Sequence, residues 1–144
     1  MKRILVALDS SPRAAAVLGA GIELARTTGA KIWLMRAVTL PAELPANMWG
    51  AAPTLTVDGF MNTAKRDLAE IATAVPSELL EGASAEVGVP WDAICSVARE
   101  HDVDMIVIGS HGYRLLDRII GTTAAKVVNH ADRPVLVVRE KDAA

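Results

Sequence analysis

The sequence predicts a three-layer, doubly wound α/β domain in which a five-stranded parallel sheet is covered by four helices. Short apolar runs alternate strictly with longer segments whose apolar residues recur at steps of three and four. Several of the short runs are continuously apolar, which is typical of parallel strands that are buried on both faces. Right-handed crossovers between consecutive strands then favour the doubly wound arrangement.

The five expected strands are the short apolar runs, rich in β-branched and other large apolar residues. They cover residues 4–8, 32–38, 83–89, 105–108 and 135–138. The first run follows Lys2 and Arg3 and so imitates the start of a signal peptide, but it ends after five residues at Asp9. We therefore interpret it as a strand.

Four helices are expected between these strands, each with one apolar face. Their apolar positions fall within residues 14–25, 61–75, 91–98 and 124–131. The first helix is expected to begin at Ser11-Pro12, where a hydroxyl can cap free amides and proline suits the first helical position, and to end at Gly29. Pro76 and Pro134 bound the second and fourth helices.

Length and composition favour one globular domain over residues 1–144, with 51% hydrophobic and 22% charged residues. A net charge of -2 without a basic run gives no basis for binding nucleic acid or a membrane surface. The single cysteine, Cys95, excludes an internal disulfide framework and fits a reducing compartment. No apolar stretch approaches the ~20 residues of a membrane-spanning helix, so a cytoplasmic location is expected.

The segment most informative about function follows the fourth expected strand. Gly109 and Gly112 are followed by eight residues and then by Gly121-Thr122-Thr123, which opens a helix. Glycines let backbone amides approach an anion closely, and a helix amino terminus adds free N–H groups and a favourable dipole. Neither the Walker A pattern nor the dinucleotide fingerprint is present. Spacing alone leaves two interpretations open: a phosphate site, or a tight turn followed by a helix cap.

Four segments, spread over nearly the whole chain, resemble the universal stress protein family. They are ILVALDSS at 4–11, GVPWDAI at 88–94, DMIVIGSHG at 104–112 and GTTAAKVVNHADRPVLVVR at 121–139. The resemblance implies a sheet of order 3-2-1-4-5, usually in a dimer, with an adenine nucleotide bound across strands one and four. The chain departs from the nucleotide-binding pattern at residues 113–120, which number eight where the family pattern has nine.

The resemblance also implies roles for individual residues. Ala7 and Leu8 would touch the base, Asp9 would meet the ribose and Val38 would line the adenine pocket. The residues that would surround the phosphates are Gly109, His111, Gly112, Gly121, Thr122 and Thr123. Asp9 suits a helix cap equally well, and His111 suits a permissive turn.

The family resemblance implies a symmetric homodimer through the terminal strand, with Val135, Val137 and Val138 at the interface. The function that follows is a stress-response regulator that binds ATP or another adenine nucleotide and acts on an unknown protein partner as a dimeric sensor or adaptor. The alternative is a scaffold dimer that binds no nucleotide. No metal-ligand cluster or hydrolase triad is recognisable. Mg²⁺ would therefore enter with a triphosphate, and no enzymatic activity is expected beyond, at most, slow ATP hydrolysis.

Overall fold

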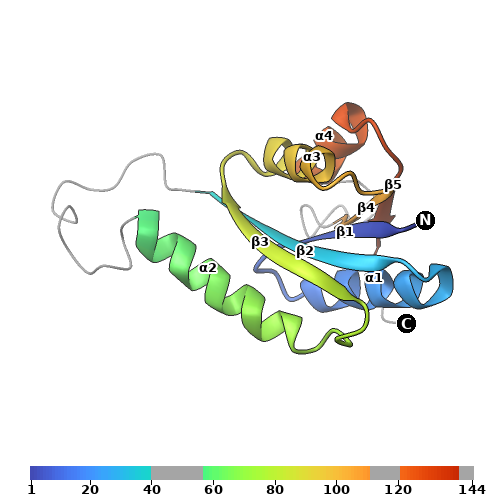
Figure 1. The fold of residues 1–144 in the computed structure, drawn as a ribbon. Coiled ribbons are helices and arrows are strands. Elements are labelled where there is room, and N and C mark those ends of the chain that lie inside the picture. The colour runs from blue at the N-terminus through green and yellow to red at the C-terminus, as the bar shows by residue number, and fades with distance from the viewer. Residues whose placement is uncertain (40–56, 111–120, 140–144) are drawn as a thin grey trace, which may run out of the picture.

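The computed structural model describes residues 1–39, 57–110 and 121–139. These residues form alternating strands and helices in the expected order (Figure 1). The strands are β1 (Arg3–Leu8), β2 (Lys31–Val38), β3 (Leu80–Val87), β4 (Met105–Gly109) and β5 (Val135–Val138). The helices are α1 (Ala14–Thr28), α2 (Val57–Ala72), α3 (Pro90–Glu100) and α4 (Thr122–His130).

The five strands form one parallel sheet of order β3-β2-β1-β4-β5, which confirms the predicted topology. Helices α1 and α2 lie on one face of the sheet, and α3 and α4 lie on the other (Figure 1). Because consecutive residues of a strand point to opposite faces, β1 contributes side chains to the hydrophobic core on both faces of the sheet. Ile4 and Val6 belong to the core cluster under α1 and α2, and Leu5 belongs to the cluster under α3 and α4.

Helix α1 packs closely on the central strand at Gly21. A Cβ atom at this position would lie 2.6 Å from Cγ2 of Val6, so a larger residue would push the helix away from β1. The helix ends as predicted at Gly29, which adopts the left-handed conformation (φ 77°) and donates its N–H to the Ala25 carbonyl. The connection back into β2 is therefore tight.

Two predicted boundaries were wrong. Helix α1 begins at Ala14 rather than Ser11, because Ser11 lies in a turn and its Oγ accepts the Arg13 N–H at 3.2 Å without capping the helix. Strand β3 covers Leu80–Val87 rather than residues 83–89: a register irregularity opposite Ile32 and Trp33 lets it begin earlier, and Val89 serves as the N-cap of α3.

The predicted apolar faces were also wrong at one position of α4, where Val128 is exposed while Val127 is buried. Cys95 is buried on α3, as the apolar spacing predicted, and this burial raises the pKa of its thiol. Within the described ranges, no helix is long and apolar enough to cross a membrane.

Charged side chains at the amino end of the sheet form ion pairs and hydrogen bonds with other groups of the chain. Arg3 pairs with Glu81 through Nε and Oε2 at 2.7 Å, and this hydrogen bond lowers the pKa of the Glu81 carboxyl. The same guanidinium donates to the His101 carbonyl at the end of α3. The Asp104 carboxylate accepts the backbone N–H groups of Lys2 and Arg3 at 2.6 and 3.0 Å, which lowers its pKa.

Arg133 closes the neighbouring part of this end, just before β5. Its Nη1 donates to the carbonyls of Ala98 and Val103 at 2.8 and 3.0 Å, so the guanidinium joins the carboxyl end of α3 to the turn that leads into β4. Trp33 stacks on His101 with ring centroids 3.9 Å apart. The amino end is thus filled by side chains of the chain itself.

Candidate functional site

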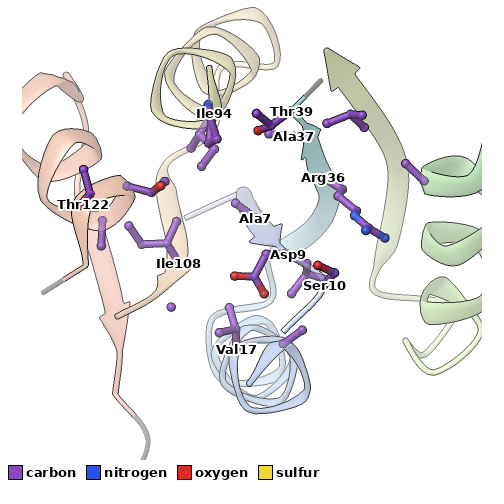
Figure 2. A pocket seen from close by; sticks show the side chains of 18 of the residues that line it. Ala7, Asp9, Ser10, Val17, Arg36, Ala37, Thr39, Ile94, Ile108 and Thr122 are labelled. Atoms are coloured by element: carbon purple, nitrogen blue, oxygen red, sulfur yellow. The ribbon is translucent and has the colours of Figure 1, made fainter. Parts of the chain in front are cut away.

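A cavity of about 900 Å³ opens at the carboxyl end of the sheet. Its walls come from the ends of β1, β2 and β4, from the first residues of α3 and α4, and from the sides of α1 and α2. Parallel strands leave their carboxyl ends at one edge, where the chain turns into the following helices. Figure 2 shows Thr122 on one side, Arg36 on the opposite side, and Ala7 and Asp9 between them.

Strand β1 supplies the centre of the cavity wall. Ala7 and Leu8, which the resemblance places at the nucleotide base, line the cavity, and the short side chain of Ala7 leaves room above the strand. Asp9 also lines it, and its Oδ1 accepts the Ser11 N–H at 2.9 Å. The carboxylate is therefore held by the turn before α1 and does not cap the helix, whose N-cap is Arg13 without a side-chain cap.

Strand β4 and helix α4 form the second wall. Gly109, Thr122 and Thr123 line the cavity. Gly121 is the N-cap of α4 and has no side-chain cap; its N–H donates to the Ser110 carbonyl at 3.2 Å. The first turn of α4 thus directs N–H groups and the positive end of its dipole toward this wall. His111 and Gly112 lie outside the described residues.

The end of β2 and helix α2 form the third wall. Val38 lines the cavity and packs with Ala64 of α2 and Ala85 of β3. Phe60 and Thr63 of α2 line the cavity beside them. The sequence did not indicate these α2 residues, because nothing in the spacing of an amphipathic helix says which of its turns will stand over a strand end.

Three further lining residues were missed although a signal was present. Pro90 and Ile94 lie in the segment 88–94 that carries the family resemblance, directly after a strand. Arg36 lies two residues from both Leu34 and Val38, so strand alternation places it on the same face as these buried residues. Its Nη1 donates to Oδ2 of Asp67 on α2 at 3.0 Å.

The cavity combines apolar side chains with the amino end of a helix. Apolar side chains such as Val17, Val38 and Ile94 can cover a flat ring, and the amino end of α4 with its threonines can hold a negative group. Among the residues that the structure describes, no group of three His, Cys, Asp or Glu side chains is placed to hold a metal ion.

Strand β5 lies at the edge of the sheet, beside β4. Val135 and Val137 pack against the core under α3 and α4, and Val138 packs against the core under α1 and α2. Leu136, which was not among the residues predicted for the interface, is the exposed apolar residue of this strand, with 38% of its surface accessible. Its side chain is therefore the most available one at this edge of the sheet.

Residues 1–139 match the model of the Universal stress protein family. The chain belongs to this family. Universal stress protein A homolog 2 of Coxiella burnetii is 30% identical over 141 residues, which cover 97% of this chain and 96% of that relative.

Solved structures of universal stress proteins share the fold. UspA from Lactobacillus plantarum is 27% identical with a TM-score of 0.74, and the match covers 96% of this chain and 97% of that one. The universal stress protein from Archaeoglobus fulgidus, solved in complex with dAMP, is 29% identical with a TM-score of 0.68 over 96% and 98% of the two chains. That relative therefore binds an adenine nucleotide.

Proposed function

We propose that this universal stress protein binds an adenine nucleotide, most simply ATP, in the cavity at the carboxyl ends of β1 and β4. The observation that carries the proposal is the cavity itself, which brings Asp9 and the amino end of α4 to one apolar-walled space. The complex of the Archaeoglobus fulgidus relative with dAMP supports the same ligand class. The protein would act as a dimeric sensor or adaptor in a stress response, through an unidentified protein partner.

Each part of the ligand has a partner of matching chemistry. The phosphates lie at the amino end of α4, where backbone N–H groups and the hydroxyls of Thr122 and Thr123 donate to them, and Gly109 allows close approach. The ribose hydroxyls donate to the Asp9 carboxylate. The base lies against Val38 and Ile94. Mg²⁺ enters with a triphosphate and keeps most of its waters.

The test begins with gently purified protein, which is denatured so that any released nucleotide can be identified by chromatography. Calorimetric titration with ATP, ADP, AMP and cyclic AMP then ranks the ligands. Replacing both Thr122 and Thr123 by valine removes two hydroxyl donors and is expected to weaken ATP binding about tenfold, on the order of 1.4 kcal/mol. Thr27→Val, on the exposed side of α1, is the matched control.

Absence of both bound nucleotide and binding heat for all four ligands would refute the nucleotide proposal. The remaining function would then be the scaffold dimer of the same fold. Equal ATP affinities of the double valine variant and the wild type would leave nucleotide binding intact but move the phosphates away from α4.

We further infer that two copies pair through β5. The support is that β5 is an edge strand, which leaves backbone groups available to a second chain, and that Leu136 is exposed beside them. Val135, Val137 and Val138, the residues first predicted for this interface, would contribute through the backbone and the parts of their side chains that remain accessible.

Leu136→Asp tests this pairing without emptying the core, because Leu136 projects out of it. A charge on this edge strand would be brought close to the same charge of a second copy and lose water on pairing, so the variant is expected to sediment as a monomer where the wild type is a dimer. Val87→Asp is the matched control, since Val87 is an exposed valine on the opposite edge strand. An unchanged sedimentation coefficient for Leu136→Asp would exclude β5 as the dimer interface.

A further inference from the structure

The α2 side of the cavity contains a largely buried charge. The side chain of Arg36 is 20% exposed, and it stands on the face of β2 that Leu34 and Val38 fill with apolar groups. Burying a guanidinium in such a row is costly unless its donors are satisfied. The position therefore requires partners for Arg36, from the protein, from water or from a ligand in the cavity.

The described part of the chain supplies only part of this requirement. A guanidinium carries five N–H donors and no acceptor. Within residues 1–39, 57–110 and 121–139, its partner is Asp67, which accepts from Nη1 at 3.0 Å and is itself half exposed. This single bond ties α2 to the sheet and offsets the charge. The other N–H groups of the guanidinium are left for water or for an acceptor in the cavity that Arg36 lines.

The cavity places Arg36 opposite the amino end of α4 (Figure 2). Strands β4, β1 and β2 are neighbours, so their ends span about 10 Å at the usual strand spacing. A nucleotide with its phosphates at Thr122 and its ribose at Asp9 extends its base past β1 toward β2. The edge of the base that points away from the phosphates then faces the Arg36 side of the cavity.

We propose that Arg36 is a specificity-determining residue at the base end of this site, and that it makes the site accept 6-oxopurine nucleotides together with adenine nucleotides. The inference rests on the nucleotide site proposed above. An arginine fork donates simultaneously to O6 and N7 of a 6-oxopurine. Adenine offers N7 as an acceptor but carries an amino donor at position 6, which an all-donor guanidinium cannot pair. Arg36 thus makes two hydrogen bonds to a 6-oxopurine and one to adenine.

ITP and ATP are the probes, because inosine carries an oxo group at position 6 where adenosine has the amino group. The ratio of the two dissociation constants is measured by calorimetry for the wild type, Arg36→Met and Arg36→Lys. Arg26→Met, an exposed arginine of α1, is the matched control. Urea unfolding of each variant shows whether it is folded. Arg36→Lys keeps the charge and a donor for Asp67 but loses the planar fork, so it provides the test if Arg36→Met does not fold.

The wild type is expected to bind ITP as tightly as ATP or up to about tenfold more tightly. Arg36→Met should shift the ratio toward ATP about tenfold, in line with the discrimination of one bidentate arginine contact. Arg36→Lys should shift it in the same direction by a smaller factor, and Arg26→Met should leave it unchanged.

Two results would overturn the inference and leave the nucleotide site standing: binding of ATP without measurable binding of ITP by the wild type, or an ITP to ATP ratio that is the same in the wild type and both Arg36 variants. Failure of the wild type to bind any nucleotide would instead overturn the proposed function, and the role of Arg36 with it.

Discussion

The two ends of the same parallel sheet are built in opposite ways. At the amino end, Arg3, Arg133 and Asp104 direct their charged groups at backbone carbonyls and N–H groups of the chain. At the carboxyl end, small residues such as Ala7 and Gly109 border a cavity of about 900 Å³. At one end the charged side chains bond to the backbone of the chain, and at the other the strand ends border an open cavity.

Helix direction explains why the charges are distributed in this way. Every helix that follows a parallel strand begins at the carboxyl end of the sheet and ends at the amino end. The negative ends of the helix dipoles therefore meet at the amino end, where Arg3 and Arg133 donate to carbonyls at the end of α3. The positive end of α4 faces the cavity. The same polarity that draws arginines to one end favours an anion at the other.

The largest loss of stability is expected when Arg133 at the amino end is replaced. Its guanidinium is largely buried and donates to the carbonyls of Ala98 and Val103, which Arg133→Met would leave without this partner. Hydrogen bonds of a charged donor of this kind contribute about 2–3 kcal/mol, so the free energy of unfolding in urea should fall by that amount. ATP affinity should stay the same, since Arg133 lies at the far end of the sheet.

Arg99→Met is the control for this change, because Arg99 is an exposed arginine of α3. It should alter the free energy of unfolding by less than about 0.5 kcal/mol. An Arg133→Met protein as stable as the wild type would show that the amino end does not depend on its internal partners.

Asp9→Asn, at the carboxyl end, is expected to have the opposite pattern: a loss of ATP affinity with little loss of stability. Asparagine keeps an oxygen for the Ser11 N–H, so the turn before α1 should survive and the free energy of unfolding should change by less than about 1 kcal/mol. Loss of the carboxylate weakens the proposed hydrogen bonds to the ribose, and ATP affinity should fall about tenfold, on the order of 1.4 kcal/mol. Calorimetry measures the affinity. A loss of stability with unchanged affinity would assign Asp9 to the turn alone.

The smallest effect is expected at Asp104 and depends on pH. Backbone N–H donors from Lys2 and Arg3 lower the pKa of this carboxyl in the folded protein. Its ionised form therefore stabilises the fold above its unfolded pKa of about 3.9, and this contribution is lost as the pH falls through the lower folded pKa. Asp104→Asn should be slightly less stable than the wild type at neutral pH, and the difference should shrink below pH ~4. A difference that is the same at pH 7 and pH 3 would contradict this origin.

Sequence reasoning predicted the alternation of strands and helices, because apolar periodicity reports burial directly. The strand order came from the family resemblance, since alternation alone allows other doubly wound orders. The boundary of β3 was wrong because its first residues, Leu80 and Glu81, show no apolar run, and its pairing with β2 through an irregular register is a tertiary effect.

The cavity was partly predictable for the same physical reason. Residues at strand ends, such as Asp9 and Gly109, must lie together once the strands are parallel. The contribution of α2, through Phe60 and Thr63, depends on how that helix lies over the sheet and has no local signature. Arg36 was overlooked because one charge inside a strand normally indicates a solvated face. The ligand roles of the site residues, including His111 and Gly112, stay predictions.

The Gly121 N–H donates to the Ser110 carbonyl at 3.2 Å, so the two residues that flank positions 111–120 lie side by side. The Ser110 N–H in turn donates to the carbonyl of Val138 in β5 at 3.0 Å, so the contact between Ser110 and Gly121 is fixed to the sheet. Adding or removing a residue between such anchored ends costs little, because closure entropy changes slowly with length. A change in the number of residues between Ser110 and Gly121 is therefore expected to leave the register of β4 and β5 and the start of α4 unchanged.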